Sequence, residues 1–189
     1  PADTTPVNPK DDGFWGNTIT VINKVANTVL NLTLKDVKID VSNTGKDTGN
    51  PWNSDEGKAA LSVQGKGNVE IELDGNNELK SGTQSAGLEK NSTGTLTLKD
   101  DNKDGSLRAE GGSGGAGIGG GSGDGSGDGD GENITIKGGT VTATGGGYRG
   151  NSGAGIGGGS SGSGENIRVC RSPKFCKTDR KSTRLNSSH

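Results

Sequence analysis

The chain has 189 residues and a formal net charge of −2 at pH 7, and 38 of its residues are glycine. Hydrophobic residues make up 24% and aromatic residues 3%, which is too little for the core of a sandwich or an α/β domain. The lack of a Gly-X-Y period excludes collagen, and no apolar run approaches the roughly 20 residues that span a bilayer. The slightly acidic balance disfavours nucleic-acid binding.

A glycine-rich motif occurs twice in the second half of the chain. Gly-Ala-Gly-Ile-Gly-Gly-Gly stands at residues 115–121 and again at 153–159, and each copy precedes a Gly/Ser-rich run and then Gly-Glu-Asn-Ile. Weaker copies lie upstream. The alanines that mark the four copies are Ala59, Ala86, Ala116 and Ala154. A repeat whose length drifts in its Gly/Ser loops is typical of a solenoid, in which the stacked strands stay constant and the loops vary.

Each repeat carries three short apolar segments, most of them with alternating hydrophobicity. In one repeat these are Ala116/Ile118, Ile134/Ile136 and Val141/Ala143. Alternation places the apolar side chains on one face of a strand and the polar ones on the other. Three strands per repeat predict an all-β fold, a right-handed parallel β-helix (β-solenoid) of about four to five coils with Gly-rich loops. The alternative is a disordered Gly/Ser chain.

The first residues, 1–17, are polar and proline-rich, and we expect a linker or a cap there. Phe14 and Trp15 would cover the exposed end of the first coil, and a sugar platform is the alternative role for Trp15. The solenoid is expected over residues 18–169. Its coils are predicted at residues 18–43, 59–85, 86–115 and 116–153, with a partial coil from residue 154.

The repeat breaks off near the end of the chain. Residues 170–178 stand where another strand is due, and we interpret them as a divergent or frameshifted end in which Cys170 and Cys176 can form a local disulfide. Residues 179–189 resemble the translation of an adapter oligonucleotide used in short-read DNA sequencing, so we treat them as an artefact. The only histidine, His189, lies there, which leaves catalysis without its usual base. We therefore expect no enzyme.

The sharpest local signal is the run Asp-Asp-Asn-Lys-Asp-Gly that starts at residue 100. Asp100, Asn102 and Asp104 alternate before Gly105, which matches the opening of a calcium loop whose oxygen side chains converge as the chain turns. The twelfth position is Gly111 where an EF-hand needs a bidentate Glu. The candidate is therefore a weaker calcium site in a β-turn, and the alternative is an Asp/Asn/Gly turn that needs no ion.

Two aromatic residues are candidates for carbohydrate binding. Trp52 lies in a polar loop between the first and second coils, and Tyr148 lies beside Arg149 in a Gly-rich stretch. A flat aromatic ring with an apolar face suits the C–H face of a pyranose. The alternative for Trp52 is a side chain folded against the flank of the solenoid.

Several short motifs together resemble one family. They are Asp-Gly-Asn-Asn-Glu-Leu at 74–79, Ala-Gly-Leu at 86–88, Thr-Gly-Thr-Leu-Thr-Leu at 93–98 and the two Gly-Ala-Gly-Ile copies. Over residues 18–169 the chain resembles bacterial carbohydrate-binding domain-containing proteins. The resemblance implies a secreted or surface-attached protein, similar to calcium-containing, polysaccharide-lyase-like right-handed β-helices that bind cellulose and acidic sugars. The family's calcium ligands have no residue-by-residue match here.

The sequence therefore predicts a non-catalytic, extracellular polysaccharide-binding module, secreted or on the cell surface, with calcium as the candidate cofactor. The expected partner is cellulose or an acidic glycan, without nucleic acid and without membrane insertion. We expect a monomeric domain of a larger protein. The alternative is a structural surface or adhesin solenoid without a glycan site.

Overall fold

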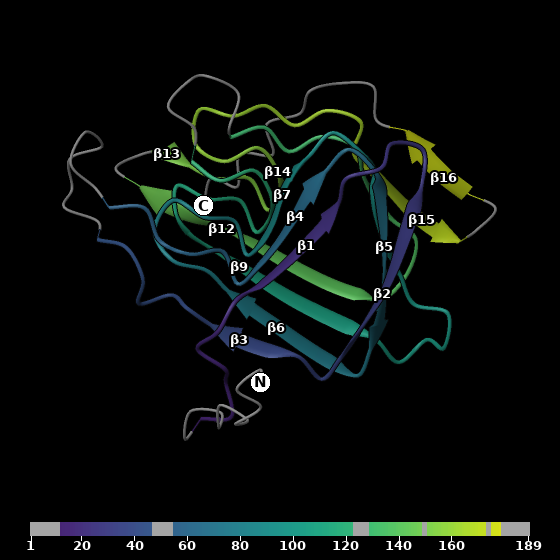
Figure 1. Cartoon of the computed structure of the whole chain (residues 1–189), viewed down its shortest axis with the longest axis horizontal. Helices are drawn as coiled ribbons and strands as arrows, with labels where there is room; N and C mark the ends of the chain where they lie inside the picture. Colours follow the sequence, from purple (N-terminus) through teal and green to yellow (C-terminus); the bar gives the residue numbers. More distant parts are fainter. Residues whose placement is uncertain (1–11, 47–54, 123–128, 149–150, 173–174, 179–189) are drawn as a thin grey trace.

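The computed structural model describes residues 12–46, 55–122, 129–148, 151–172 and 175–178. These ranges contain sixteen β-strands and no helix, so the predicted all-β class is confirmed. The strands form three sheets, in which neighbours are parallel except in the hairpins β12–β13 and β15–β16. Figure 1 shows the three sheets with their strands stacked side by side.

We name each sheet after its first strand in the chain. The β1 sheet contains β1 (Ile19–Asn23), β4 (Leu61–Gly65), β7 (Leu88–Ser92), β10 (Ile118–Gly119) and β14 (Ile156–Gly157). The β2 sheet contains β2 (Val29–Lys35), β5 (Asn68–Asp74), β8 (Leu96–Lys99), β11 (Ile134–Ile136), β15 (Arg168–Ser172) and β16 (Phe175–Thr178). The β3 sheet contains β3 (Lys38–Asp40), β6 (Asn76–Lys80), β9 (Ser106–Ser113), β12 (Thr140–Tyr148) and β13 (Asn151–Ser152).

The chain visits the three sheets in turn, so three successive strands make one unit. Unit 1 is β1–β3, unit 2 is β4–β6, unit 3 is β7–β9 and unit 4 is β10–β12. Equivalent strands pair in register, and Leu32, Ile71, Leu98 and Ile136 therefore form one inward row. Buried aliphatic side chains from all three sheets join in a single hydrophobic cluster. The predicted alternation thus places the core on the inner faces of the strands.

The two glycine-rich copies stack directly on each other. Ile118 pairs with Ile156, and Gly119 pairs with Gly157, each of these glycines at a φ of 134°. A side chain at this φ would be strained, which explains why glycine occupies both positions. The motif therefore serves the close stacking of units 4 and 5, where β14 and β15 begin a fifth unit.

A buried amide holds the corner between β5 and β6. Asn77 Oδ1 accepts a hydrogen bond from Val37 N at 2.9 Å, and its Nδ2 donates to Asp74 O at 3.2 Å and to Ser106 O at 3.1 Å. The three partners belong to units 1, 2 and 3. One side chain thus hydrogen-bonds to backbone groups of three consecutive units, and it supplies the partner of Val37 N.

The two ends of the stack are covered differently. Trp15 pairs its backbone with the edge of β3, donating to Lys38 O at 2.9 Å and accepting from Asp40 N at 3.0 Å. At the other end, β16 folds back antiparallel on β15, beside the main stack (Figure 1). The stretch that interrupts the sequence repeat thus forms this hairpin, and Cys170 within it is buried and disulfide-bonded.

Candidate functional site

The outward face of the β3 sheet carries three polar rows. The rows are Asn76–Ser106–Thr140, Lys38–Glu78–Arg108–Thr142 and Asp40–Lys80–Glu110–Thr144. They alternate along each strand with inward aliphatic residues such as Ile39 and Leu79, which are buried. Strand pairing therefore brings together side chains that stand roughly 30 residues apart in the sequence, at the spacing of about 4.8 Å between neighbouring strands. We call this surface the β3 face.

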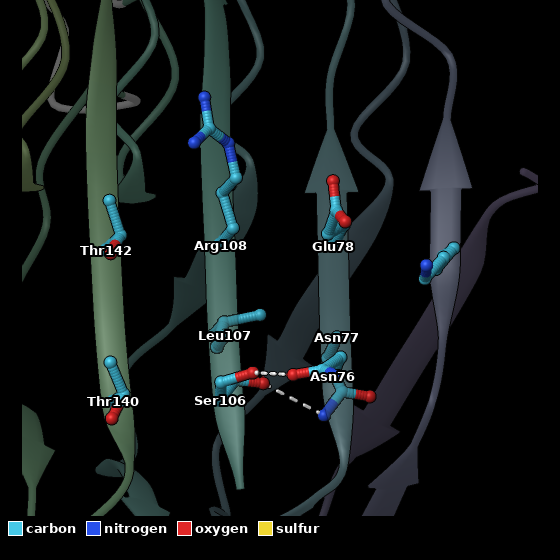
Figure 2. Close-up of a pocket in the computed structure, with 9 residues that line it drawn as sticks. Asn76, Asn77, Glu78, Ser106, Leu107, Arg108, Thr140 and Thr142 are labelled. Atoms are coloured by element: carbon cyan, nitrogen blue, oxygen red, sulfur yellow. Dashed lines mark hydrogen bonds between the residues drawn. The ribbon is translucent and has the colours of Figure 1, made fainter.

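A shallow groove of about 260 Å³ crosses the β3 face. Figure 2 shows Asn76, Ser106 and Thr140 side by side at one end, with Glu78, Arg108 and Thr142 in the next row. Ser106 Oγ donates to Asn76 Oδ1 at 2.9 Å, which orients the first row. Amide, hydroxyl, carboxylate and guanidinium groups are thus exposed together along one open groove.

Charges of both signs alternate on this face. Lys38, Lys80 and Arg108 supply three cations, while Asp40, Glu78 and Glu110 supply three anions. Arg108 Nε also donates to Glu110 Oε1 at 2.7 Å along the same strand. The balance of charge and the number of donors and acceptors suit a polyhydroxylated ligand better than a strongly charged one.

An aromatic ring lies beside the β3 face. Lys80 Nζ lies 4.5 Å from the centre of the Phe14 ring, a cation–π contact. Phe14 immediately precedes Trp15, whose backbone pairs with β3. The sequence indicated Phe14 only as part of a cap. Its place beside a polar face depends on the pairing of a single residue with β3, which leaves no periodic signal in the sequence.

The aromatic residues predicted to bind carbohydrate are not both described. Trp52 lies outside the described residues. Tyr148 is the last residue of β12, where its backbone pairs with Asn151 of β13, so it belongs to the same sheet as the groove. Its contribution to binding stays a prediction.

The predicted calcium ligands lie in the turn between β8 and β9. Asp100 Oδ1 accepts a hydrogen bond from Lys103 N at 2.8 Å, and Lys103 has a φ of 66°, while Asn102 and Asp104 are exposed. This is a turn closed by its own aspartate. In the part of the chain that the structure describes, no three His, Cys, Asp or Glu side chains come together in a way that could hold a metal ion. Calcium binding stays a prediction.

The outward face of the β2 sheet differs from the β3 face, because it carries ion pairs between neighbouring strands. Lys35 Nζ lies 3.0 Å from Asp74 Oδ2, and Lys99 Nζ lies 3.5 Å from Glu72 Oε2 and also 2.9 Å from Asp101 Oδ2 in the turn that follows β8. The hydrogen bond between Lys99 and Asp101 raises the pKa of Lys99 and lowers that of Asp101. The β2 sheet therefore offers a control surface of similar composition for any test of the β3 face.

Lys90 is a buried cation in the β1 sheet. It is 2% exposed, pairs in register with Val63, and its Nζ donates to Ser92 O at 2.6 Å. Burial lowers the pKa of Lys90, and the nearby carboxylate of Glu132 opposes this shift. A cleft of about 460 Å³ borders this lysine. Perturbed ionisable groups beside a cleft are typical of active sites, and Glu89 lines the same cleft.

The neighbouring Glu89 holds the backbone in place. Its Oε2 accepts from Ala86 N at 3.2 Å, and burial raises its pKa. In the next unit the equivalent N–H, that of Ala116, bonds instead to the carbonyl oxygen of Gly120 at 3.0 Å. The Glu89 carboxylate thus takes the place of a backbone carbonyl. Its hydrogen bonding thus gives the residue a structural role in the fold.

No family model, no curated protein and no solved structure matches the chain. Within the described ranges, no helix is long and apolar enough to cross a membrane.

Proposed function

We propose that this chain is a non-catalytic, extracellular module that binds polysaccharide on the β3 face. We also propose that the three sheets wrap around their shared core as a right-handed parallel β-helix. The order of the strands supports this architecture, since each third strand returns to the same sheet, and crossovers between parallel strands are almost always right-handed.

The observation that carries the proposed function is the groove on the β3 face. Its rows repeat from strand to strand, and they present amide, hydroxyl and paired charged groups without a deep pocket (Figure 2). A polymer of sugar units likewise presents hydroxyl groups at regular intervals. An open, repetitive and polar surface therefore suits an extended glycan better than a small substrate, which binds in an enclosed and mostly apolar cavity.

The disulfide bond of Cys170 supports an extracellular location, because structural disulfides persist in oxidising compartments. Calcium at Asp100, Asn102 and Asp104 remains part of the proposal. Their oxygen atoms are the type of ligand that calcium prefers, although Asp100 is engaged by Lys103 N in its own turn. Calcium would act by ordering this turn, so its effect can be separated from the β3 face. Neither nucleic acid nor membrane insertion is proposed.

A pull-down of the whole chain on insoluble cellulose and on immobilised pectin tests the proposal. Glu78→Ala combined with Arg108→Ala should reduce retention by about tenfold, because the two side chains line the groove in one row. The matched control is Lys35→Ala combined with Asp74→Ala, an acid–base pair in register on the β2 sheet. The control should retain the glycan as the wild type does, and circular dichroism should show both variants folded.

Chelation separates the ion from the groove. If the wild type is no longer retained on the glycan in chelator, and Asp104→Ala is not retained even with calcium, the result supports a calcium-assisted module. If chelator leaves retention of the wild type unchanged, calcium is removed from the proposal. A folded wild-type protein that binds neither glycan contradicts the proposed function. That result favours the second candidate, a structural surface or adhesin solenoid, for which the stack of repeats in three sheets is the supporting observation.

A further inference from the structure

Strand β2 is the edge strand at the start of the β2 sheet. It pairs with β5 on one side, and no other strand of the described residues lies on its second side. Edge strands of soluble proteins are usually short, interrupted by proline or a bulge, or charged along their length. β2 has seven residues, contains neither proline nor glycine, and carries one charge, Lys35, at its end.

Backbone hydrogen bonds show which groups face the open side. Asn68 N donates to Thr28 O at 2.8 Å, and Asp36 N donates to Asp74 O at 3.2 Å. In a parallel pair, alternate residues direct both their N–H and C=O to the same neighbour, so the even-numbered residues of β2 face β5. The residues that present their N–H and C=O to the open edge are Val29, Asn31, Thr33 and Lys35.

Unit 1 exposes apolar side chains on β2 itself, in the turn before it and on β1. Leu30 is 40% exposed, although its register partner Val69 is fully buried. Val25 is 61% exposed, and Ile22 and Val29 are about half exposed. A strand added to β2 would pair the free backbone groups and cover part of this apolar surface at once. The edge therefore fits an extended strand as its partner.

We propose that the partner is a second copy of this chain, and that two β2 strands pair antiparallel about a two-fold axis at Leu32. In this register Asn31 faces Thr33 of the second copy, and Lys35 faces Val29 of the second copy. Both are hydrogen-bonded pairs, because all four residues direct their N–H and C=O to the open edge. Leu32 then forms a non-hydrogen-bonded pair with its own equivalent.

The sequence of β2 is complementary to itself in this arrangement. Leu30 lies opposite Leu34 of the second copy on the inner side, and no like charges meet, since each Lys35 lies opposite a valine and is already paired with Asp74 of its own chain. A dimer with a two-fold axis uses the same surface on both copies, so that surface has to be complementary to itself. Such a dimer departs from the monomeric domain expected from the sequence.

The position of the axis makes a cysteine test specific. Non-hydrogen-bonded pairs have Cα atoms about 4.5 Å apart, within the range that a disulfide spans. Leu32→Cys should therefore give a disulfide-linked dimer on mild oxidation. The matched control is Leu30→Cys, on the same face of the same strand. Its equivalent in the second copy lies about 14 Å away, which is too far for a disulfide.

Sedimentation velocity of the whole wild-type chain in reductant gives the second measurement. We expect a dimer that dissociates on dilution, and Asn31→Lys combined with Thr33→Lys should weaken it about tenfold, since lysines then meet lysines across the axis. Asn31→Lys combined with Thr33→Glu should restore it. A chain that stays monomeric at every concentration overturns the proposal. So does oxidation that links Leu30→Cys as readily as Leu32→Cys.

Discussion

Units 1 and 3 have the same alternating pattern in the β2 sheet but differ in burial. Leu30 of β2 and Leu96 of β8 both pair in register with Val69 of β5, one on each side. Leu96 is fully buried, whereas Leu30 is 40% exposed. An inner unit is covered on both sides, and an end unit on one. Alternation thus specifies which face of a strand is apolar, and stacking decides how much that face contributes to stability.

The largest expected effect tests this difference directly. Leu96→Ala should lower the free energy of unfolding by about 2–5 kcal/mol, because it leaves a cavity in a closely packed row. Leu30→Ala should lower it by less than about 1 kcal/mol, since the side chain is partly in water already. Urea unfolding of both variants at low micromolar concentration measures the two costs. Equal costs would show that the first unit is covered in solution even as a monomer.

The second expected effect concerns the link between units 1, 2 and 3. Asn77→Ala should cost about 1–3 kcal/mol, because Val37 N loses its buried partner, and Asp74 O and Ser106 O each lose one hydrogen bond. The matched control is Asn76→Ala, one residue earlier, whose side chain is exposed and should cost less than about 0.5 kcal/mol. Thermal unfolding of both variants provides the measurement. If the two costs are similar, the Asn77 network does not hold the units together.

Much of this architecture could be predicted from the sequence, because it depends on local alternation. The segment Ile134/Ile136 was expected to face inward, and it forms β11, in register with Leu96 and Leu98 of β8. The coverage of the end units and the hairpin of β15 and β16 could not be predicted in this way. Both depend on which strand lies beside which, and in the hairpin the repeat itself has ended.

The candidate site was harder to predict from the sequence than the fold. On the β3 face Glu78 lies beside Arg108, although 30 residues separate them in the sequence. The loops between the strands vary in length, so the register of this pair could not be read from the sequence. The calcium signal at Asp100 depends on spacing along the chain, which an ordinary turn shares, and the structure shows the aspartate bonded to its own turn. Residue types indicated a polar outer surface, but only pairing between strands shows which polar groups lie side by side.

The smallest expected effect concerns a row of the β1 sheet in which the inner unit 3 contributes a buried lysine. Val21, Val63 and Lys90 follow one another in register in units 1, 2 and 3. Replacing a buried charge by an apolar side chain of similar length is often neutral or stabilising. Lys90→Met should therefore raise the free energy of unfolding at pH 7, by on the order of 1 kcal/mol. The same substitution at the exposed Lys66 is the control and should change little.

The dependence on pH identifies the cause of this gain. Burial lowers the pKa of Lys90 below its ordinary value of 10.5, so the unfolded chain holds this proton more tightly than the folded chain does. By linkage, Lys90 makes the wild type more stable as pH rises from the lowered pKa towards 10.5. The advantage of Lys90→Met should therefore be largest at pH 7 and shrink as pH approaches 10.5. Urea unfolding across this interval measures the difference, and an advantage that is constant with pH would show that the lysine keeps its ordinary pKa in the folded chain.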